Sequence, residues 1–295
     1  MPLVIGTRGS ALALAQAERV RRLLGEAGLE SELRLIATIG DTVTSVPLHE
    51  IGGQGVFVRA LDEALLRGEC DCAVHSMKDI PAARPPGVTT AAVLRRDSPA
   101  DFLATDIEAP HVIGSSSTRR RAQLLRHDPG CDVRALRGNV DTRLRRLAEG
   151  EYEGILLAEA GLERLGLEVE GRRLPPEEFV PSTNQGTIAV VSRDEPVLVA
   201  ALEKVLNDPA SRRDTMIERA VMEELGGGCF TTIGCWCRSG HLIAEVLSLD
   251  GDRWVRREAD VPGPDEARAF GRTLRDDAAE LIREAYERLG LTNGG

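Results

Sequence analysis

Short apolar runs alternate with stretches of helical periodicity along most of the chain, and this pattern predicts an α/β protein. The apolar run LVIG at residues 3–6 predicts a strand, and ALALAQAERVRRLL after it predicts a helix. ELRLIAT and DCAVHS predict two further strands, with an amphipathic helix in GVFVRALDEALLRGE between them. The strand VTTAAVL is followed by the charged, proline-containing segment RRDSPADF, which predicts a crossover to a second lobe.

The second lobe repeats the design of the first and begins with HVIGSSSTRRRAQLLR. Its further strands and helices are predicted in CDVRALRG, NVDTRLRRLAEG, EYEGILLAE and AGLERLGL, and the proline-rich PPEEFVPSTNQG then leads to the strand TIAVVSR. A βα lobe that is interrupted by another and then resumed predicts two periplasmic-binding-protein-like lobes, joined by a hinge of two crossings. We expect residues 1–96 and 186–206 to form lobe 1, and residues 97–185 to form lobe 2.

Residues 207–295 predict a small α+β domain that completes this α/β architecture. A helical stretch with a break at NDP, near Asn207, leads to ELGGGCFTTIGCWC at residues 224–237, and two strands and one long amphipathic helix follow. Cys229 comes after three consecutive glycines, whose large backbone entropy predicts a mobile or closely approached loop that presents the cysteine. Taken alone, this stretch is better explained as a flexible turn that contains a cysteine by chance.

Composition narrows the class of protein. At 295 residues the chain is long enough for two or three domains. A net charge of -10 and 3% aromatic residues argue against a general nucleic-acid or anionic-membrane surface, because no lobe is strongly basic and no aromatic platform for bases is evident. No stretch approaches the roughly 18 apolar residues of a membrane span. The N-terminus has no signal peptide, so we expect a cytoplasmic protein.

The six cysteines do not predict a disulfide framework, since such frameworks belong mainly to small secreted domains. Cys235 and Cys237 are spaced to lie on one face of a strand. Together with Cys229 and His241 they could supply three or four zinc ligands. Structural zinc sites usually use wider spacing, so we favour buried strand cysteines and predict no metal.

Two turns that precede helices could bind anions. Arg8 lies in the turn after the first strand, and Ser10 is a plausible N-cap of the helix that follows. In the second lobe, residues 119–121 are three arginines in the first turn of a helix, where cations oppose the helix dipole. A bound anion would compensate for them, although any single arginine of this kind is more often only solvated.

Lys78 and Asp79 come directly after the predicted strand DCAVHS. Open α/β sheets carry their ligands at the carboxyl ends of strands, so both residues are candidates for a site. Arg137, Arg143 and Arg164 lie near strand ends or helix starts of the second lobe. Each of them alone would more often be a surface ion pair, but the set favours an anionic ligand.

Seven motifs resemble those of the porphobilinogen deaminase family, also called hydroxymethylbilane synthases, in order and approximate spacing. They are TRGSALALAQ, GVFVRALDEALL, AVHSMKDIP, GSSSTRRRAQ, LRGNVDTRL, GLERLGL and GGGCFTTIG, and they extend over nearly the whole chain. AVHSMKDIP together with LRGNVDTR is the most specific part of the resemblance.

The resemblance implies an enzyme that condenses four porphobilinogen molecules head to tail into the linear tetrapyrrole hydroxymethylbilane, with release of ammonia. It implies a dipyrromethane cofactor joined by a thioether to Cys229, and Asp79 as the catalytic acid and base. The implied cofactor-binding residues are Ser76, Lys78, Ser116, Arg119, Arg120, Arg137 and Gly186, and the implied substrate-binding residues are Arg8, Ser10, Arg143, Arg164 and Gln185. We expect porphobilinogen as the small-molecule partner, neither nucleic acid nor membrane, and a monomeric enzyme.

The residue types suit this chemistry. Porphobilinogen carries an acetate and a propionate, and planar guanidinium groups bind carboxylates through two parallel hydrogen bonds without losing their charge. A carboxylate near the pyrrole nitrogens can stabilise the positive charge that develops during condensation and then help to remove the α-proton.

The sequence departs from the commoner family pattern at Gln54, Asn184 and Thr232, where lysine, glycine and proline are more frequent. None of these changes touches the implied acid or the attachment thiol, so they bear on loop behaviour.

Two other classes of protein remain open on the residues alone. A non-catalytic two-lobed anion-binding protein would share the lobes and arginines but would not need Cys229. A zinc-dependent hydrolase would use Cys229, Cys235, Cys237 and His241.

Overall fold

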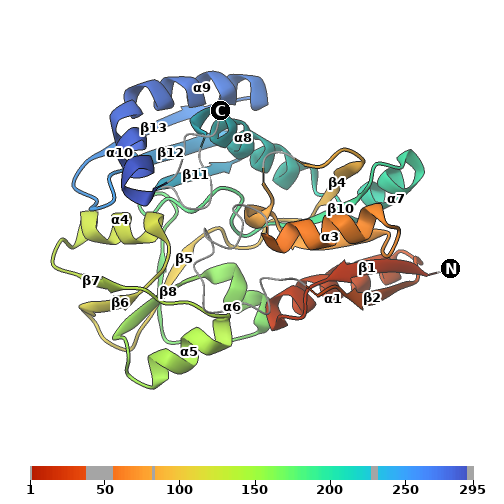
Figure 1. Cartoon of the computed structure of the whole chain (residues 1–295), viewed down its shortest axis with the longest axis horizontal. Coiled ribbons are helices and arrows are strands. Elements are labelled where there is room, and N and C mark those ends of the chain that lie inside the picture. The colour runs from red at the N-terminus through yellow and green to blue at the C-terminus, as the bar shows by residue number, and fades with distance from the viewer. Residues whose placement is uncertain (1, 38–55, 82–83, 227–231, 291–295) are drawn as a thin grey trace. The chain divides into compact units, whose positions relative to one another are not determined.

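The computed structural model describes residues 2–37, 56–81, 84–226 and 232–290 (Figure 1). The chain forms two compact units. Unit 1 comprises Met1–Asp97 and Gly186–Arg212, and unit 2 comprises Ser98–Gln185 and Arg213–Gly295. The chain passes between the units at residues 97–98, 185–186 and 212–213, and the C-terminal segment shares one compact unit with the second lobe.

Unit 1 is built on a five-stranded sheet in the order β2-β1-β3-β10-β4. β1 pairs in parallel with β2 and β3, and β10 runs antiparallel to β3 and β4. Its strands are β1 (Leu3–Thr7), β2 (Ser31–Leu35), β3 (Cys72–Ser76), β4 (Val88–Val93) and β10 (Ile188–Arg193), and its helices are α1 (Ala11–Glu26), α3 (Val56–Leu66) and α7 (Pro196–Leu206).

Apolar side chains cover both faces of this sheet. On one face Val74 and Val190 pack with residues of α1 and α7. On the other face Ala73 and Val191 pack with Leu61 and its neighbours on α3. Because both faces are buried, the central strands are continuous apolar runs rather than alternating ones, which is why they were recognisable from the sequence.

The second lobe, in unit 2, has a five-stranded sheet in the order β7-β6-β8-β5-β9. β6 pairs in parallel with β7 and β8, whereas β5 runs antiparallel to β8 and β9. Its strands are β5 (Asp101–Ala104), β6 (Val112–Gly114), β7 (Asp132–Arg134), β8 (Gly154–Ala158) and β9 (Gly171–Leu174), and its helices are α4 (Thr118–His127), α5 (Val140–Ala148) and α6 (Glu159–Leu165).

The prediction that RRDSPADF is a crossover was wrong for the last residues of that segment. Asp101 and Phe102 belong to β5, and β9 was not predicted at all. Both strands have only four residues, and Pro99 precedes β5, so neither shows a periodicity that distinguishes it from a loop.

The C-terminal part of unit 2 has an antiparallel three-stranded sheet, β11 (Ile233–Arg238), β12 (His241–Leu247) and β13 (Trp254–Asp260). The break at NDP is confirmed, since α7 ends at Leu206 and α8 (Pro209–Leu225) begins after it. The single long C-terminal helix was wrong: α9 (Pro264–Asp277) and α10 (Ala279–Leu289) meet at Ala278. This break allows Leu274 and Leu281 to enter one core.

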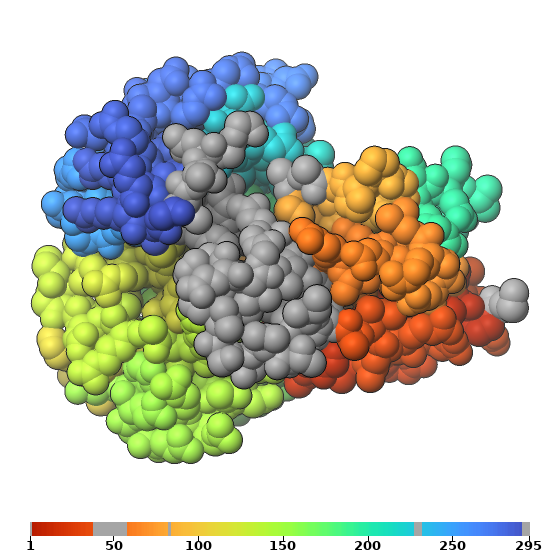
Figure 2. Space-filling view, viewed as in Figure 1, coloured from red at the N-terminus to blue at the C-terminus, as the bar shows by residue number. Residues whose placement is uncertain are grey.

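α4 contacts the C-terminal sheet within unit 2. The space-filling view shows the C-terminal elements, in blue, directly against the yellow-green second lobe (Figure 2). Arg126 on α4 donates to the buried Glu245 on β12 over 2.9 Å. An added Cβ at Gly251 would lie 2.1 Å from the carbonyl oxygen of Ala122, so the close approach requires glycine. None of the described helices is long and apolar enough to cross a membrane.

Candidate active site

In unit 1 the candidate residues lie at one edge of the sheet. β1 and β3 are adjacent and parallel, with Gly6 opposite Ala73, so the turns that follow them meet at the same edge. Ser10 caps α1 by accepting from the backbone N–H of Ala13 over 3.4 Å. Gln16 on α1 donates to Ser76 Oγ at the end of β3 over 2.8 Å.

Asp79 closes the short 3-10 turn Met77–Asp79 that follows β3. The backbone N–H of Met77 donates to Thr187 O over 2.9 Å, and that of Ile80 donates to Met77 O over 3.1 Å. The backbone therefore holds the turn from both sides. Asp79 is exposed and Lys78 is half-buried, so the carboxylate is presented to solvent at the sheet edge.

His75 precedes this turn and is 6% exposed. Burial lowers the pKa of His75 to about 3, and the positive charges of Arg84 and Arg8 lower it further in the same direction. The imidazole is therefore neutral at physiological pH. Positive charge at this end of unit 1 comes from arginine and lysine rather than from the histidine.

In the second lobe the turn between β6 and α4 carries the serines. Ser117 is the N-cap of α4 and accepts from the backbone N–H of Arg120 over 3.3 Å. Ser116 is exposed and donates to Leu136 O over 2.8 Å, next to the exposed Arg137. The third arginine of the first turn, Arg121, donates to Val133 O on β7.

Arg119 and Arg120 share one buried carboxylate, Asp101 of β5. Arg119 Nη2 lies 2.7 Å from Asp101 Oδ2, and Arg120 Nη2 lies 2.7 Å from Oδ1. Asp101 is 0% exposed, and the two arginines are 3% and 7% exposed. Burial alone would raise the pKa of Asp101, but the two guanidinium groups together hold it below its ordinary value. Part of the compensation that we expected from a bound anion thus comes from the protein itself.

Asp101 was missed by reasoning from the sequence, since RRDSPADF was interpreted as a polar crossover. The available signal was the arginine-rich first turn of α4, which has no acidic residue of its own. Cations in the first turn of a helix are stabilised by a nearby carboxylate, because they oppose the helix dipole. The sequence does not identify which residue supplies that carboxylate.

Arg143 lies near Arg120. Burial lowers the pKa of Arg143 to about 10, and repulsion from Arg120 contributes in the same direction. Its Nε donates to Gly138 O over 2.8 Å. Gly138 has a φ of 112°, and an added Cβ would lie 2.8 Å from Thr142, which explains the glycine of the LRGN motif. Arg164 is half-buried in the last turn of α6.

Gln185 and Gly186 lie where the chain passes between the units. Gln185 is 1% exposed, and its side-chain amide donates to Asp101 Oδ1 over 2.8 Å. Gly186 has a φ of 85°. Asn184, at a position where the family often has glycine, has a φ of 63°, which asparagine tolerates better than most residues.

Cys229, the implied attachment residue, and Gln54, a departure from the family pattern, lie outside the described residues. The other proposed zinc ligands have separate partners: Cys235 Sγ contacts Glu218 O, Cys237 Sγ contacts Asp214 Oδ1, and the exposed His241 lies 2.9 Å from Asp260. Among the described residues no group of three or more histidine, cysteine or acidic side chains could hold a metal ion.

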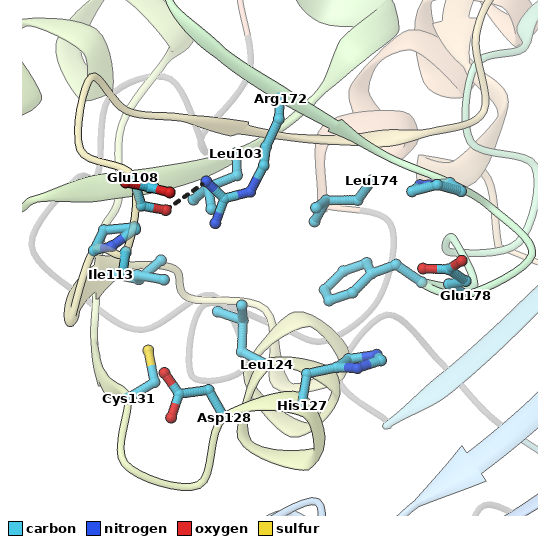
Figure 3. A pocket seen from close by; sticks show the side chains of 14 residues that line it. Leu103, Glu108, Ile113, Leu124, His127, Asp128, Cys131, Arg172, Leu174 and Glu178 are labelled. Atoms are coloured by element: carbon cyan, nitrogen blue, oxygen red, sulfur yellow. Dashed lines mark hydrogen bonds between the residues drawn. The ribbon is translucent and has the colours of Figure 1, made fainter.

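A cavity of about 330 Å³ opens in the second lobe (Figure 3). Leu103, Leu124 and Phe179 line it, and Arg172 points into it and donates to Glu108 O over 3.1 Å. None of the candidate residues that the structure describes lines this cavity. Its chemistry is mainly apolar, unlike a site for a polycarboxylate.

Comparison with known proteins gives consistent matches over nearly the full chain. Residues 3–200 match the family model described as "Porphobilinogen deaminase, dipyromethane cofactor binding domain", and residues 213–280 match "Porphobilinogen deaminase, C-terminal domain". A "Probable porphobilinogen deaminase" of Methanosarcina acetivorans is 49% identical, with 96% of this chain and 94% of that protein covered. A "Porphobilinogen deaminase" of Rubrobacter xylanophilus is 42% identical, with 99% and 98% covered.

Among solved structures, a periplasmic substrate-binding protein of an ABC transporter from Coxiella burnetii is similar with a TM-score of 0.43 and 14% identity, over 71% of this chain and 94% of that one. An ancestral cationic amino acid solute-binding protein is similar with a TM-score of 0.44 and 14% identity, over 69% and 87%.

The enzymes of the matched family condense porphobilinogen into hydroxymethylbilane in tetrapyrrole biosynthesis and use a dipyrromethane cofactor. The family models and the relatives at 40–50% identity cover both lobes and the C-terminal part of the chain. The chain therefore belongs to the porphobilinogen deaminase family.

Proposed function

We propose that Cys229 carries the dipyrromethane cofactor of this hydroxymethylbilane synthase through a thioether, and that Asp79 is the acid and base of each condensation. The arginines bind the carboxylates of the cofactor and of the growing chain. The observation that supports this most directly is the buried Arg119–Arg120 pair, in which two guanidinium groups face one protein carboxylate.

The arginine pair fits an anionic cofactor. Within the described residues the two guanidinium groups form ion pairs with one carboxylate, Asp101, which leaves one positive charge without an ion pair; Glu245 attracts Arg119 but makes no ion pair with it. In the same part of the chain, Arg119 Nε is buried without a hydrogen-bond partner. A buried N–H without an acceptor costs free energy, and a carboxylate from a bound group would satisfy both the surplus charge and the donor. Arg119, Arg120 and the exposed Ser116 and Arg137 would hold the cofactor in this lobe.

Asp79 has the features of a general acid and base. Its carboxylate is exposed at a sheet edge while backbone hydrogen bonds hold the turn that carries it. It can therefore stay in place while successive rings are presented to it, stabilise positive charge near a pyrrole nitrogen and accept a proton. When bound, the dipyrromethane supplies the covalent anchor from which the chain is extended.

Arg143 is suited to the incoming or growing chain. It is half-buried, and within the described part of the chain its hydrogen bond is from Nε to Gly138 O, so its remaining N–H groups can donate to a substrate carboxylate. Burial and the nearby charge of Arg120 weaken its hold on the proton, yet with a pKa of about 10 it stays charged at pH 7. Arg8, Ser10 and Arg164 complete the proposed substrate contacts, whereas the buried Gln185 would act through Asp101, to which its amide donates.

The proposal includes a monomeric enzyme that acts in the cytoplasm. Size-exclusion chromatography with light scattering should give a mass near 31.9 kDa, the mass of one chain. A stable mass of twice that value would remove the monomer from the proposal.

The attachment is tested by intact-mass measurement. The wild-type protein should carry an adduct of two deaminated pyrrole units and turn pink-red with Ehrlich's reagent. Cys229→Ser should lose both signals, whereas Cys235→Ser, at a buried strand position in the same segment of the chain, should keep them. An adduct retained by Cys229→Ser would show that another residue carries the cofactor.

A further inference from the structure

Asp101, Arg119, Arg120 and Gln185 form one buried hydrogen-bonded cluster within unit 2. The cluster lies next to two of the three points where the chain passes between the units, since Asp101 follows residues 97–98 closely and Gln185 is the last residue before Gly186. All four side chains belong to residues that are at most 7% exposed. The cluster thus joins the arginine pair to the connecting segments of the chain.

Asp101 uses both of its oxygens to hold the arginines. Oδ1 accepts from Arg120 Nε over 3.1 Å, from Arg120 Nη2 over 2.7 Å and from Gln185 Nε2 over 2.8 Å. Oδ2 accepts from Arg119 Nη2 over 2.7 Å. Two donors from one guanidinium group on the same oxygen, and a third from the amide, leave Asp101 little freedom to rotate.

The opposite sides of the two guanidinium groups are held by backbone carbonyls. Arg119 Nη1 donates to Val180 O over 2.8 Å, and Arg120 Nη1 donates to Leu156 O over 2.9 Å. The ring of Phe179 lies 5.9 Å from the guanidinium carbon of Arg119. Each plane is therefore fixed at two or more points, and the direction of the unbonded Arg119 Nε is fixed with it.

Gln185 links the arginine pair to the residues that follow the first passage of the chain between the units, at residues 97–98. The same amide nitrogen that donates to Asp101 lies 2.8 Å from Pro99 O and 3.3 Å from Ala100 O. The backbone N–H of Gln185 donates to Ser182 O over 3.0 Å, which closes a turn in the second segment. One amide group thus ties residues 99–101 of one segment to the segment that contains Gln185.

Stability alone does not account for such a cluster. Removing two cations and an anion from water is costly, and an apolar cluster of similar volume would often be at least as stable. The hydrogen bonds to Asp101, Val180 O and Leu156 O fix the orientation of both guanidinium groups. Among the described residues one donor of the cluster, Arg119 Nε, has no acceptor, and the ion pairs with Asp101 leave one positive charge over, so the fixed orientation suits an anionic ligand.

We propose that Asp101 and Gln185 are positioning residues for the condensation reaction. Asp101 sets the spacing and orientation of the Arg119 and Arg120 guanidinium groups and leaves one positive charge for a ligand carboxylate. Gln185 ties that orientation to the two chain segments that connect the units. The inference rests on the proposed function, in which the arginine pair holds carboxylates of the cofactor.

The charge count is tested with Gln185→Glu, a nearly isosteric change. It replaces the donating amide by a second carboxyl group, which would face Asp101 Oδ1, Pro99 O and Ala100 O, so it removes a donor from the cluster and, where it ionises, the surplus positive charge as well. We expect adduct formation from preassembled tetrapyrrole, followed by intact mass, to slow by about 10- to 100-fold, the loss expected for a charge-assisted hydrogen bond. Because three acceptors lose their donor, the urea midpoint should also fall, and the rate is therefore measured on the folded protein. A loading rate equal to that of wild type would overturn the charge argument.

The link that the Gln185 amide makes to residues 99–101 is tested with Gln185→Leu. This change removes the amide but leaves the charges of Asp101, Arg119 and Arg120 as they are. Loading should remain within about threefold of wild type, while kcat falls about 10-fold or more at a KM that changes less. Enzyme species with one to three extra pyrrole units should accumulate in single-turnover mass spectra. Wild-type kcat and wild-type intermediate populations would overturn the role of Gln185.

Asp101→Asn removes the shared carboxylate, and Asp62→Asn is its matched control. Asp62 lies 2.6 Å from Arg84 in unit 1 and is also buried, so its loss equally leaves an arginine without its acid. Both variants should unfold at lower urea concentration than wild type, but only Asp101→Asn should load slowly, and Asp101→Glu should recover part of the loading rate. Equal loading by the two asparagine variants would overturn the role of Asp101.

These outcomes separate the inference from the proposed function. An adduct on Cys229→Ser would refute the attachment whatever the Asp101 variants do. Normal loading and turnover by Gln185→Glu and Gln185→Leu, with Cys229→Ser unloaded, would refute only the positioning role. If Asp101→Asn yields no folded protein, the two Gln185 variants still decide the question.

Discussion

His75 makes the stability of unit 1 depend on pH in a way that can be calculated. The residue lies in β3, opposite Ala189 of β10, and is 6% exposed. Burial, with repulsion from Arg84 and Arg8, lowers its pKa to about 3 in the folded protein, whereas an unfolded chain has a histidine pKa of about 6.5. Below pH 6.5 this histidine is therefore protonated in the unfolded state, whereas it stays neutral in the folded state.

The sign and size follow from linkage. The contribution of His75 is fully present above pH 6.5 and is lost as the pH falls from 6.5 toward 3. Each pH unit in this window corresponds to about 1.4 kcal/mol. Between pH 7.5 and pH 5, unit 1 should lose about 2 kcal/mol of unfolding free energy through this residue alone.

The assay compares wild type with His75→Leu, which cannot titrate. Urea unfolding at several pH values, followed by pulsed hydrogen exchange of peptides from β3 and β10, reports on unit 1. Both tryptophans, Trp236 and Trp254, belong to unit 2, so fluorescence gives an internal control for the other unit. The substitution itself changes the unfolding free energy at every pH. The two proteins are therefore compared by how steeply their unfolding free energies change with pH.

Between pH 7.5 and pH 5 the unfolding free energy of unit 1 should fall by about 2 kcal/mol more in wild type than in His75→Leu. Unit 2 should show no such difference between the two proteins. Carboxylates titrate in both proteins and cancel in the comparison. If the unfolding free energy of unit 1 changes with pH in the same way in wild type and in His75→Leu, the conclusion that His75 is buried and neutral is refuted.

Three further outcomes are expected. Gly251→Ala should destabilise unit 2 by about 2–4 kcal/mol, because φ is 76° and the new Cβ would lie 2.1 Å from Ala122 O; an unchanged urea midpoint by tryptophan fluorescence would contradict this. Asp79→Asn should fold and carry the adduct but turn over about 10² to 10⁴ times more slowly, with partial recovery in Asp79→Glu; near-normal turnover would remove Asp79 from the mechanism. Arg143→Ala should trap enzyme with one to three extra pyrroles, and a fully active protein seen only as unmodified holoenzyme would count against its proposed role.

Most elements of the two lobes were predictable because their signals are local. Apolar strands such as residues 72–76 and the capped helix after Ser10 depend on neighbours within a few positions, and the structure confirms them. The motif residues at the ends of β1 and β3 could be placed at one sheet edge for the same reason, since parallel strands bring their carboxyl ends together.

The short strands and the late helix break were not predictable. β9 has four residues at an edge, and its pairing with β5 depends on a segment about 70 residues earlier in the chain. α9 and α10 share a continuous amphipathic pattern, so the break at Ala278 follows from packing against the C-terminal sheet and not from a proline or glycine.

The chemistry of the site divides in the same way. The sequence by itself determined which residues carry charge, thiol or carboxylate and, through strand and helix ends, that many of them face one edge of a lobe. Only the tertiary structure decided that Asp101 balances Arg119 and Arg120, and that His75 is neutral. Charge balance and pKa depend on which atoms replace water around a group, and those atoms come from strands and turns far apart in the chain.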